Sequence, residues 1–214
     1  MGQIDYWDSV AEEKNFTTPF QSEIFENYVS KDAIIVDIGC GYGRTLNELY
    51  ELGYKNLIGM DYSGEMIKRG EHLYPYINFI KSDATQINMD DNSVDSVILL
   101  GVLTCTVSSN DQRNLILEIN RILRPNGIVY INDFLVNDDE RNVDRYNSFK
   151  DKYGVYGAFE LPGGGVFRHQ TQEWIDELLS IYEKKQYEVL TYITMNGHTS
   201  KGFYYIGCKK SCSD

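Results

Sequence analysis

The sequence predicts an α/β protein with a doubly wound, mostly parallel sheet, because short apolar runs alternate with amphipathic stretches along most of the chain. The apolar runs are rich in β-branched residues, which is typical of parallel strands that are buried on both faces. Helices that connect such strands must then cover both sides of the sheet. No internal repeat or flexible linker interrupts the 214 residues, so we expect a single domain over residues 1–214.

Five apolar runs are expected to form the parallel strands, at 33–39, 56–61, 77–83, 96–101 and 127–134. Between the fourth and fifth runs, Leu115, Ile119 and Leu123 recur at helical spacing. This helix is expected to end at Pro125-Asn126-Gly127, because proline and glycine both interrupt helices.

The end of the chain predicts one more helix and an antiparallel hairpin. The helix is expected over 171–185, where Trp174 and Tyr182 fall on one face. Strand-like runs follow at 186–195 and 201–210, and an Asn-Gly turn joins them. The hairpin would bring the sheet to seven strands.

Composition and charge exclude several classes of partner. The formal charge of -12 would repel a phosphate backbone, so we expect no nucleic-acid partner. The longest mostly apolar run, 94–107, is broken by polar residues and too short to span a bilayer, so we expect no membrane partner. The protein is expected to be cytoplasmic and to be a monomer or a homodimer. Four cysteines without metal-ligand spacing predict free thiols.

Three glycines follow the first predicted strand in the stretch VDIGCGYGR, at Gly39, Gly41 and Gly43, just after Asp37. In a parallel sheet, the turn after the first strand lines the crevice in which ligands bind, and glycine lets a ligand lie against the backbone. The dinucleotide motif requires glycine or alanine at position 44, where this chain has Arg44, and no phosphate-binding Gly-Lys-Ser/Thr follows. The turn therefore predicts a ligand site, and its pattern counts against NAD, FAD and a nucleoside triphosphate as the ligand.

The pattern Asp-x-Gly-x-Gly-x-Gly resembles motif I of the class I S-adenosylmethionine-dependent methyltransferases. Further matches follow in order: the second strand ends in Asp61, the third ends in Asp83, and RILRPNG precedes the fifth strand. The family carries glycine where this chain has Asn126. The resemblance covers about 30–135 strongly. It implies a Rossmann-like fold, S-adenosylmethionine as cofactor and S-adenosylhomocysteine as product.

The resemblance also implies which residues bind the cofactor. Asp61 corresponds to the acid that binds both ribose hydroxyls, Asp83 to the acid near the adenine amine, and the end of the fourth strand to the segment beside the methionine part. The full set of expected cofactor-binding residues is Asp37, Gly39, Gly41, Gly43, Asp61, Tyr62, Met66, Asp83, Ala84, Leu100 and Val102.

Methyl transfer from a sulfonium is an in-line displacement, which depends mainly on positioning in a dry pocket. If the acceptor must lose a proton, His169 is the candidate catalytic base, because it precedes the last predicted helix. The alternative is a structural or substrate-orienting histidine. We expect no metal site, because Gly101 stands where the metal-dependent members of the family place an acid.

The segment 135–170 is long for a loop and dense in aromatic and glycine residues, so we expect a lid or insertion over the active site. The segment 1–30 is expected to add an N-terminal helical cap. Candidate acceptor-binding residues in these two segments are Tyr6, Trp7, Tyr146, Tyr153, Phe167 and Arg168. An enclosed pocket favours a small, partly apolar methyl acceptor. The alternatives are an extra packed helix in place of a lid, a NAD-dependent oxidoreductase, and a non-catalytic cofactor-binding subunit.

Overall fold

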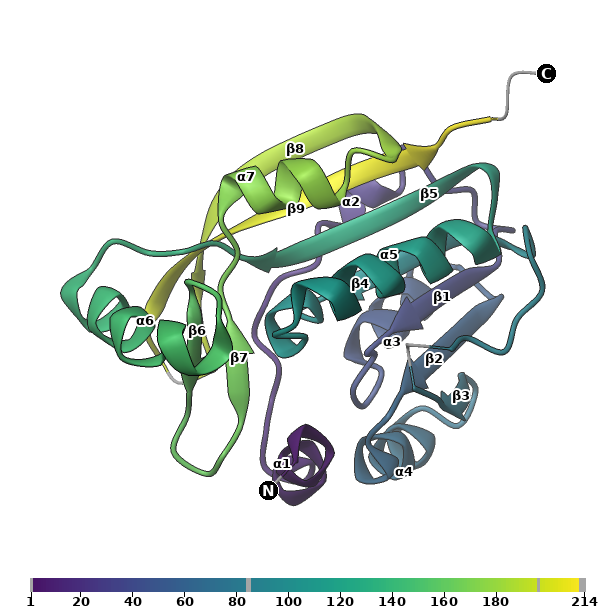
Figure 1. Ribbon diagram of the computed structural model, residues 1–214. Helices are drawn as coiled ribbons and strands as arrows, with labels where there is room; N and C mark the ends of the chain where they lie inside the picture. The colour runs from purple at the N-terminus through teal and green to yellow at the C-terminus, as the bar shows by residue number, and fades with distance from the viewer. Residues whose placement is uncertain (1, 84–85, 196, 212–214) are drawn as a thin grey trace.

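The computed structural model describes residues 2–83, 86–195 and 197–211. A seven-stranded sheet runs through it in the order β3-β2-β1-β4-β5-β9-β8, with helices on both faces (Figure 1). The five strands from β3 to β5 are parallel, and β9 pairs antiparallel with both β5 and β8. The predicted fold class and the C-terminal hairpin are therefore confirmed. The connection order reverses between β1 and β4, which is where open α/β sheets bind ligands.

The sheet strands are β1 (Ile35–Ile38), β2 (Leu57–Asp61), β3 (Asn78–Lys81), β4 (Val94–Leu100), β5 (Leu123–Phe134), β8 (Tyr182–Ile193) and β9 (Thr199–Lys209). A separate hairpin consists of β6 (Ala158–Glu160) and β7 (Val166–Arg168). The helices are α1 (Gln3–Val10), α2 (Ser22–Phe25), α3 (Arg44–Glu51), α4 (Gly64–Leu73), α5 (Ser109–Ile122), α6 (Glu140–Tyr153) and α7 (Gln172–Leu178). A short 3-10 turn, Leu103–Cys105, follows β4. No helix in the described ranges combines the length and the apolarity needed to cross a membrane.

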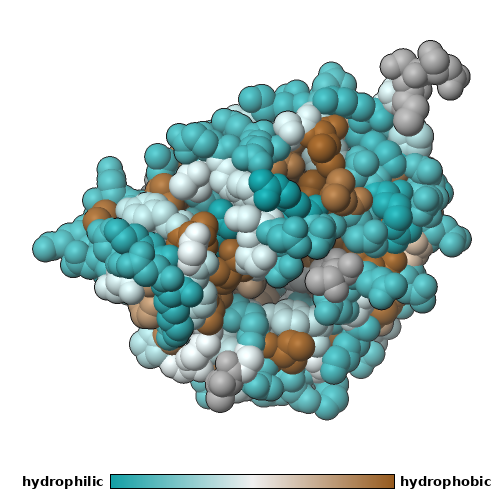
Figure 2. All heavy atoms as spheres, in the orientation of Figure 1, coloured by the Kyte–Doolittle hydropathy of each residue, from teal (hydrophilic) through white to brown (hydrophobic). Residues whose placement is uncertain are grey.

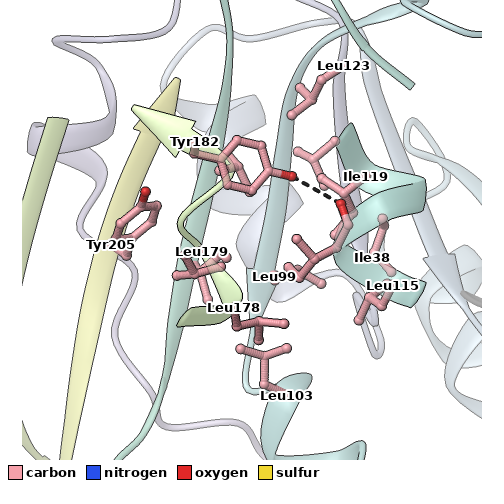
Figure 3. Close-up of a cluster of buried hydrophobic side chains, with 14 of the residues drawn as sticks. Ile38, Leu99, Leu103, Leu115, Ile119, Leu123, Leu178, Leu179, Tyr182 and Tyr205 are labelled. Carbon is pink, nitrogen blue, oxygen red and sulfur yellow. Dashed lines mark hydrogen bonds between the residues drawn. The ribbon is translucent and has the colours of Figure 1, made fainter. Parts of the chain in front are cut away.

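Two apolar cores hold the helices against the sheet. On one face, α5 and α7 pack onto β1, β4 and β5 through residues such as Ile119, Leu178 and Leu99 (Figure 3). On the other face, α2, α3 and α4 pack through a second cluster that includes Phe25, Leu46 and Ile67. Helices on both faces are what a parallel sheet needs to bury its apolar side chains.

The last helix is shorter than its sequence pattern predicts. It ends at Leu178, and Tyr182 begins β8 instead of lying on the helix. Tyr182 is buried in the first core, where its hydroxyl donates to the carbonyl of Ile116 at 3.3 Å (Figure 3). Backbone pairing with β9 from Tyr182 onward outweighs the helical tendency of Glu183-Lys184-Lys185.

The segment 135–170 is regular structure: it contains α6 and the β6–β7 hairpin. In Figure 1 these elements lie beyond the end of β5, and α1 lies near the free end of the hairpin. They share a third cluster of buried side chains, which is mainly aromatic and includes Tyr6, Trp7, Phe159 and Phe167. We call α1, α6 and the β6–β7 hairpin the cap. Gln3 joins two parts of the cap, because its side-chain amide donates to the Val166 carbonyl at 2.9 Å and accepts from the Val166 N–H at 3.0 Å.

Candidate functional site

A cavity of about 550 Å³ lies between the cap and the carboxyl ends of β1, β2 and β4. Its floor includes the glycine turn after β1 and the segment after β4, which meet at the point where the strand order reverses. Figure 2 shows a hollow on this face of the molecule, with hydrophobic surface on the side where the cap lies. The volume is in the range of cavities that bind small molecules.

The glycine turn has the conformation and the close contacts that require glycine. Gly39 and Gly41 have φ angles of +70° and +56°, which L-residues with side chains rarely adopt. A Cβ atom on Gly39 would lie 2.6 Å from Val102 Cγ2, and one on Gly41 would lie 2.2 Å from Phe16 Cε2. Gly39 and Gly41 both line the cavity. Gly43 does not; it precedes α3 and packs against Phe79 of β3.

Asp61 ends β2 and holds the glycine turn in place. Its Oδ2 accepts from the Gly41 N–H at 2.8 Å, and its Oδ1 accepts from the Ser63 N–H at 2.8 Å. A carboxylate offers about four acceptor positions, so these bonds leave Asp61 able to accept from a ligand as well. The side chain is 7% exposed and lines the cavity, and burial raises its pKa. This geometry suits a ligand with two neighbouring hydroxyl groups.

Asp37 places a second carboxylate at the end of β1. It is 2% exposed, and its Oδ1 has no hydrogen-bond partner among the described residues. Burial raises the pKa of Asp37 to about 8, although the nearby Arg44 opposes the shift. A buried carboxylate with an unpaired oxygen is unfavourable unless a donor or a positive charge reaches it. Asp37 and Asp61 therefore fit a ligand that carries hydroxyls and a positive charge, as S-adenosylmethionine does.

The other expected cofactor residues divide into two groups. Tyr62, Met66, Leu100 and Val102 all line the cavity. Asp83, which follows β3, is not among the cavity-lining residues, and Ala84 lies outside the described residues.

The walls of the cavity next to the cap are aromatic. Tyr6, Trp7 and Phe167 line it, as expected for acceptor contacts, and their ring centroids lie 5.3 to 6.0 Å apart in edge-to-face pairs. Phe159 and Phe16 also line it. The ring of Phe16 stacks on Tyr42 at 5.1 Å and so covers the glycine turn.

Three residues expected to contact the acceptor lie outside the cavity lining. Tyr153 donates its hydroxyl to Glu160 at 2.7 Å. Arg168 turns away and donates to the Val107 carbonyl at 3.1 Å and to Ser109 Oγ at 2.9 Å. Tyr146 is fully buried behind His169. Each of these three side chains is held by a partner within the protein, and their contact with an acceptor stays a prediction.

His169 lines the cavity and is fixed from behind. The Tyr146 hydroxyl and His169 Nδ1 lie 2.6 Å apart. The Asn137 backbone N–H donates to the same hydroxyl at 3.4 Å, so the phenol hydrogen is assigned to the bond with Nδ1. Burial, with Arg145 and Arg141 adding to the effect, lowers the pKa of His169 to about 3.

The imidazole is therefore neutral at physiological pH, with its proton on Nε2. No hydrogen-bond partner for Nε2 occurs within the described ranges. In this tautomer Nε2 is a donor and cannot accept a proton. The geometry therefore favours the orienting role of His169 over the role of a general base.

Several residues that line the cavity were not predicted from the sequence. Arg141 and Arg145 line the cavity from α6, and Thr194, His198 and Ser200 line it from the region of the β8–β9 turn. The spacing of Arg141 and Arg145 places them on one side of a helix, but a helix in this segment was only the alternative to a lid. For Thr194, His198 and Ser200, the local sequence predicted a hairpin turn but gave no sign that it would lie at the site.

In the part of the chain that the structure describes, no three metal-ligating side chains gather at one point. Cys40, Cys105 and Cys208 are free thiols, as expected, and burial raises the pKa of each. The absence of a metal requirement stays a prediction.

Comparison with known proteins agrees with this geometry. A protein family described as "Methyltransferase domain" matches residues 36–131, which include the glycine turn, Asp61 and the strands from β1 to most of β5. The mouse eEF1A lysine and N-terminal methyltransferase is 25% identical over 144 residues, which are 59% of this chain and 20% of that protein. A sterol 24-C-methyltransferase of Aspergillus fumigatus is 29% identical over 110 residues, 49% of this chain and 28% of that protein. The chain thus spans less than a third of the length of these curated relatives.

Solved structures cover more of the chain. A SAM-dependent methyltransferase from Methanosarcina mazei aligns with a TM-score of 0.83 and 26% identity, over 87% of this chain and 97% of its own. A second structure is the 1,6-didemethyltoxoflavin-N1-methyltransferase of Burkholderia thailandensis, solved with 1,6-didemethyltoxoflavin and S-adenosylhomocysteine. It aligns with a TM-score of 0.65 and 15% identity, over 89% of this chain and 76% of its own. The latter similarity shows the fold alone.

Proposed function

We propose, from the premise that this chain carries a class I S-adenosylmethionine-dependent methyltransferase domain, that its methyl acceptor is a small molecule bound under the cap. The observation that carries the proposal is the aromatic enclosure of the cavity. Tyr6 and Trp7 come from α1, and Phe159 and Phe167 come from the β6–β7 hairpin, so the wall is built from two segments far apart in sequence. A long polymer would have to displace this packing to reach the strand ends.

Size supports the same conclusion. The cofactor and the acceptor must share a cavity of about 550 Å³. Cavities of roughly 300–1,000 Å³ are typical for single drug-sized ligands. The space beside the cofactor therefore suits a small acceptor.

The roles proposed for the residues follow from their positions. Asp61 would accept from the ribose hydroxyls, and the backbone of Gly39 and Gly41 would lie against the cofactor. Bound S-adenosylmethionine supplies an electrophilic methyl group on a sulfonium. Trp7 and Phe167 would exclude water and hold the acceptor, since positioning in a dry site provides much of the acceleration of such a displacement. His169 would orient the acceptor through its Nε2–H.

The names of the relatives do not decide the acceptor, because one names a protein and another a sterol. A protein acceptor is the main competing proposal. A protein partner is a second competing proposal, because a similar fold occurs in the complex of a Haloferax volcanii methyltransferase with its activator. The oxidoreductase alternative has no support, because the family match is to a methyltransferase domain.

The test uses S-adenosylmethionine labelled in the methyl group. The protein is incubated with a cell extract separated into a low-molecular-weight fraction and a macromolecular fraction. We expect label to move into the low-molecular-weight fraction. Enzyme-dependent label found only on protein or nucleic acid would refute the small-molecule acceptor.

A pair of variants checks the role of the wall. Phe167→Ala opens the aromatic wall, so we expect methyl transfer to fall at least roughly ten-fold while the affinity for S-adenosylhomocysteine stays within a few-fold. Phe149→Ala is the control, because Phe149 packs on the same cluster but does not line the cavity. Equal transfer rates in the two variants would contradict the proposed role of Phe167.

A further inference from the structure

The end of the cavity formed by α6 carries two arginines. Among the described lining residues, the carboxylates are Asp37 and Asp61, both at the glycine turn. Arg141 and Arg145 line the cavity from α6. Lys14 and Arg44 also line the cavity, and Arg44 lies near Asp37, so the cofactor end carries both signs of charge. The lining residues of α6 are two cations without a carboxylate.

Arg145 is held rigidly at this end. Its guanidinium lies 3.5 Å from the centroid of the Phe159 ring, and that ring makes an edge-to-face contact with His169 at 4.9 Å. Stacking of this kind fixes the plane of a guanidinium and leaves its in-plane N–H groups free to donate. Phe159 and His169 line the cavity as well, so the three side chains form one continuous wall.

No carboxylate in the described structure pairs with Arg145. Arg145 interacts with the Tyr146 hydroxyl, which is neutral, and Arg145 Nε is buried without a hydrogen-bond partner among the described residues. Arg141 has a distant carboxylate, Asp139, at 3.9 Å. Arg145 is partly buried, and partial removal of a guanidinium from water without an anion is unfavourable, so desolvation lowers the pKa of Arg145.

We propose that the acceptor is a small anion, with a carboxylate or phosphate group on an apolar or aromatic body, and that Arg145, assisted by Arg141, binds its anionic group. This inference rests on the proposed function and names the substrate class of the same site. The planar donors of Arg145 match a carboxylate or phosphate in two-pronged geometry. The aromatic wall contacts the body of the acceptor, and His169 Nε2–H supplies one more donor near the anion.

The test measures binding of three small probes to the protein saturated with S-adenosylhomocysteine. The probes are phenylacetate, phenyl phosphate and the neutral phenylacetamide, and ligand-observed NMR titrations give the affinities. We expect at least one anion to bind roughly ten-fold or more tightly than phenylacetamide, because a hydrogen bond to a charged group is worth about 1.5–3 kcal/mol. The two anions distinguish a carboxylate site from a phosphate site.

Substitutions assign the effect to the two arginines. Arg145→Gln should reduce the affinity for the better anion about ten-fold and leave phenylacetamide unchanged. Arg141→Gln should reduce it less, because Arg141 is more exposed and is near Asp139. Arg113→Gln is the matched control: Arg113 also stacks on an aromatic ring, Trp174, at 4.5 Å, but lies outside the cavity. If Arg145→Gln does not fold, the proposal is still tested by the comparison of probes in the parent protein and by the anion affinity of the Arg141→Gln variant.

Equal affinity for the neutral and anionic probes, failure of all three probes to bind, or an unchanged anion affinity in Arg145→Gln would overturn the proposal. Failure of the proposed function gives a different result. If the parent protein does not bind S-adenosylhomocysteine, or transfers label only to macromolecules, the site assignment itself is wrong. If it binds the cofactor product and labels a neutral small molecule, only the anionic acceptor is refuted.

Discussion

The Tyr146→Phe substitution removes one hydroxyl group and should show how much the hydrogen bond to His169 contributes to stability, apart from the packing of the ring. The Tyr146 hydroxyl bonds His169 Nδ1 at 2.6 Å, and the only other donor to Nδ1 among the described residues is the Asn137 side-chain amide at 3.4 Å. Phenylalanine fills the same space but leaves Nδ1 without a close partner. An unsatisfied buried polar atom costs about 1–3 kcal/mol, so we expect the free energy of unfolding to fall by that amount.

Tyr205→Phe provides the matched control. Tyr205 is also buried, but its hydroxyl has no hydrogen-bond partner among the described residues. Removal of an unpaired buried hydroxyl should leave the free energy of unfolding unchanged or raise it slightly. Both variants are compared with the parent by urea denaturation at neutral pH, followed by circular dichroism. Thermal melting should show the same order, at about 2–4 °C for each kcal/mol.

Equal stability of the two variants would refute the assignment of the Tyr146–His169 hydrogen bond. ¹⁵N NMR of the imidazole gives a second readout. In the parent protein, Nε2 should carry the proton and Nδ1 should not, at every pH well above the lowered pKa of about 3. A protonated Nδ1 would return His169 to the role of a possible base at Nε2.

Three further predictions concern the cofactor end of the site. Asp61→Ala should weaken binding of S-adenosylhomocysteine roughly ten-fold or more in calorimetry, because two charged hydrogen bonds are lost; an unchanged affinity would remove Asp61 from the site. Because burial raises the pKa of Asp37 from 3.8 to about 8, the folded protein binds more protons than the unfolded chain between these values, and the parent should lose stability as the pH rises through that window. Asp37→Asn should therefore gain in melting temperature over the parent at about pH 8 but little at about pH 4, and a gain independent of pH would contradict this. Treatment with EDTA should leave both cofactor-product affinity and methyl transfer intact; activity that is lost and then restored by magnesium would show a metal requirement.

The sequence was sufficient for the parts of the site that depend on local chain geometry. Gly39 and Gly41 act through their own backbone angles, and Asp61 through its place at a strand end, so a pattern of neighbouring residues identifies them. The alternation of strands and helices was equally local, and it predicted the seven-stranded sheet.

Features that depend on contacts distant in sequence could not be predicted. Tyr146 and His169 meet across 23 residues, and the direction of their hydrogen bond depends on Asn137. Arg145 needs the ring of Phe159 beside it to become a fixed cation at the cavity. The start of β8 at Tyr182 was mistaken for helix because Glu183-Lys184-Lys185 suits a helix, and only the presence of β9 as a partner decides otherwise.

The junction between α1 and β7 also provides a natural reporter of cap opening. The Val166 amide hydrogen is bonded to the Gln3 side chain and not to another strand, so its protection from exchange with deuterated solvent depends on the docking of α1. The neighbouring Leu161 amide bonds within its own hairpin, to the Gly165 carbonyl at 2.8 Å, and reports the hairpin alone. Comparison of exchange at these two positions separates undocking of α1 from unfolding of the hairpin. The protein thus carries, without any added label, a measure of how often α1 separates from the hairpin.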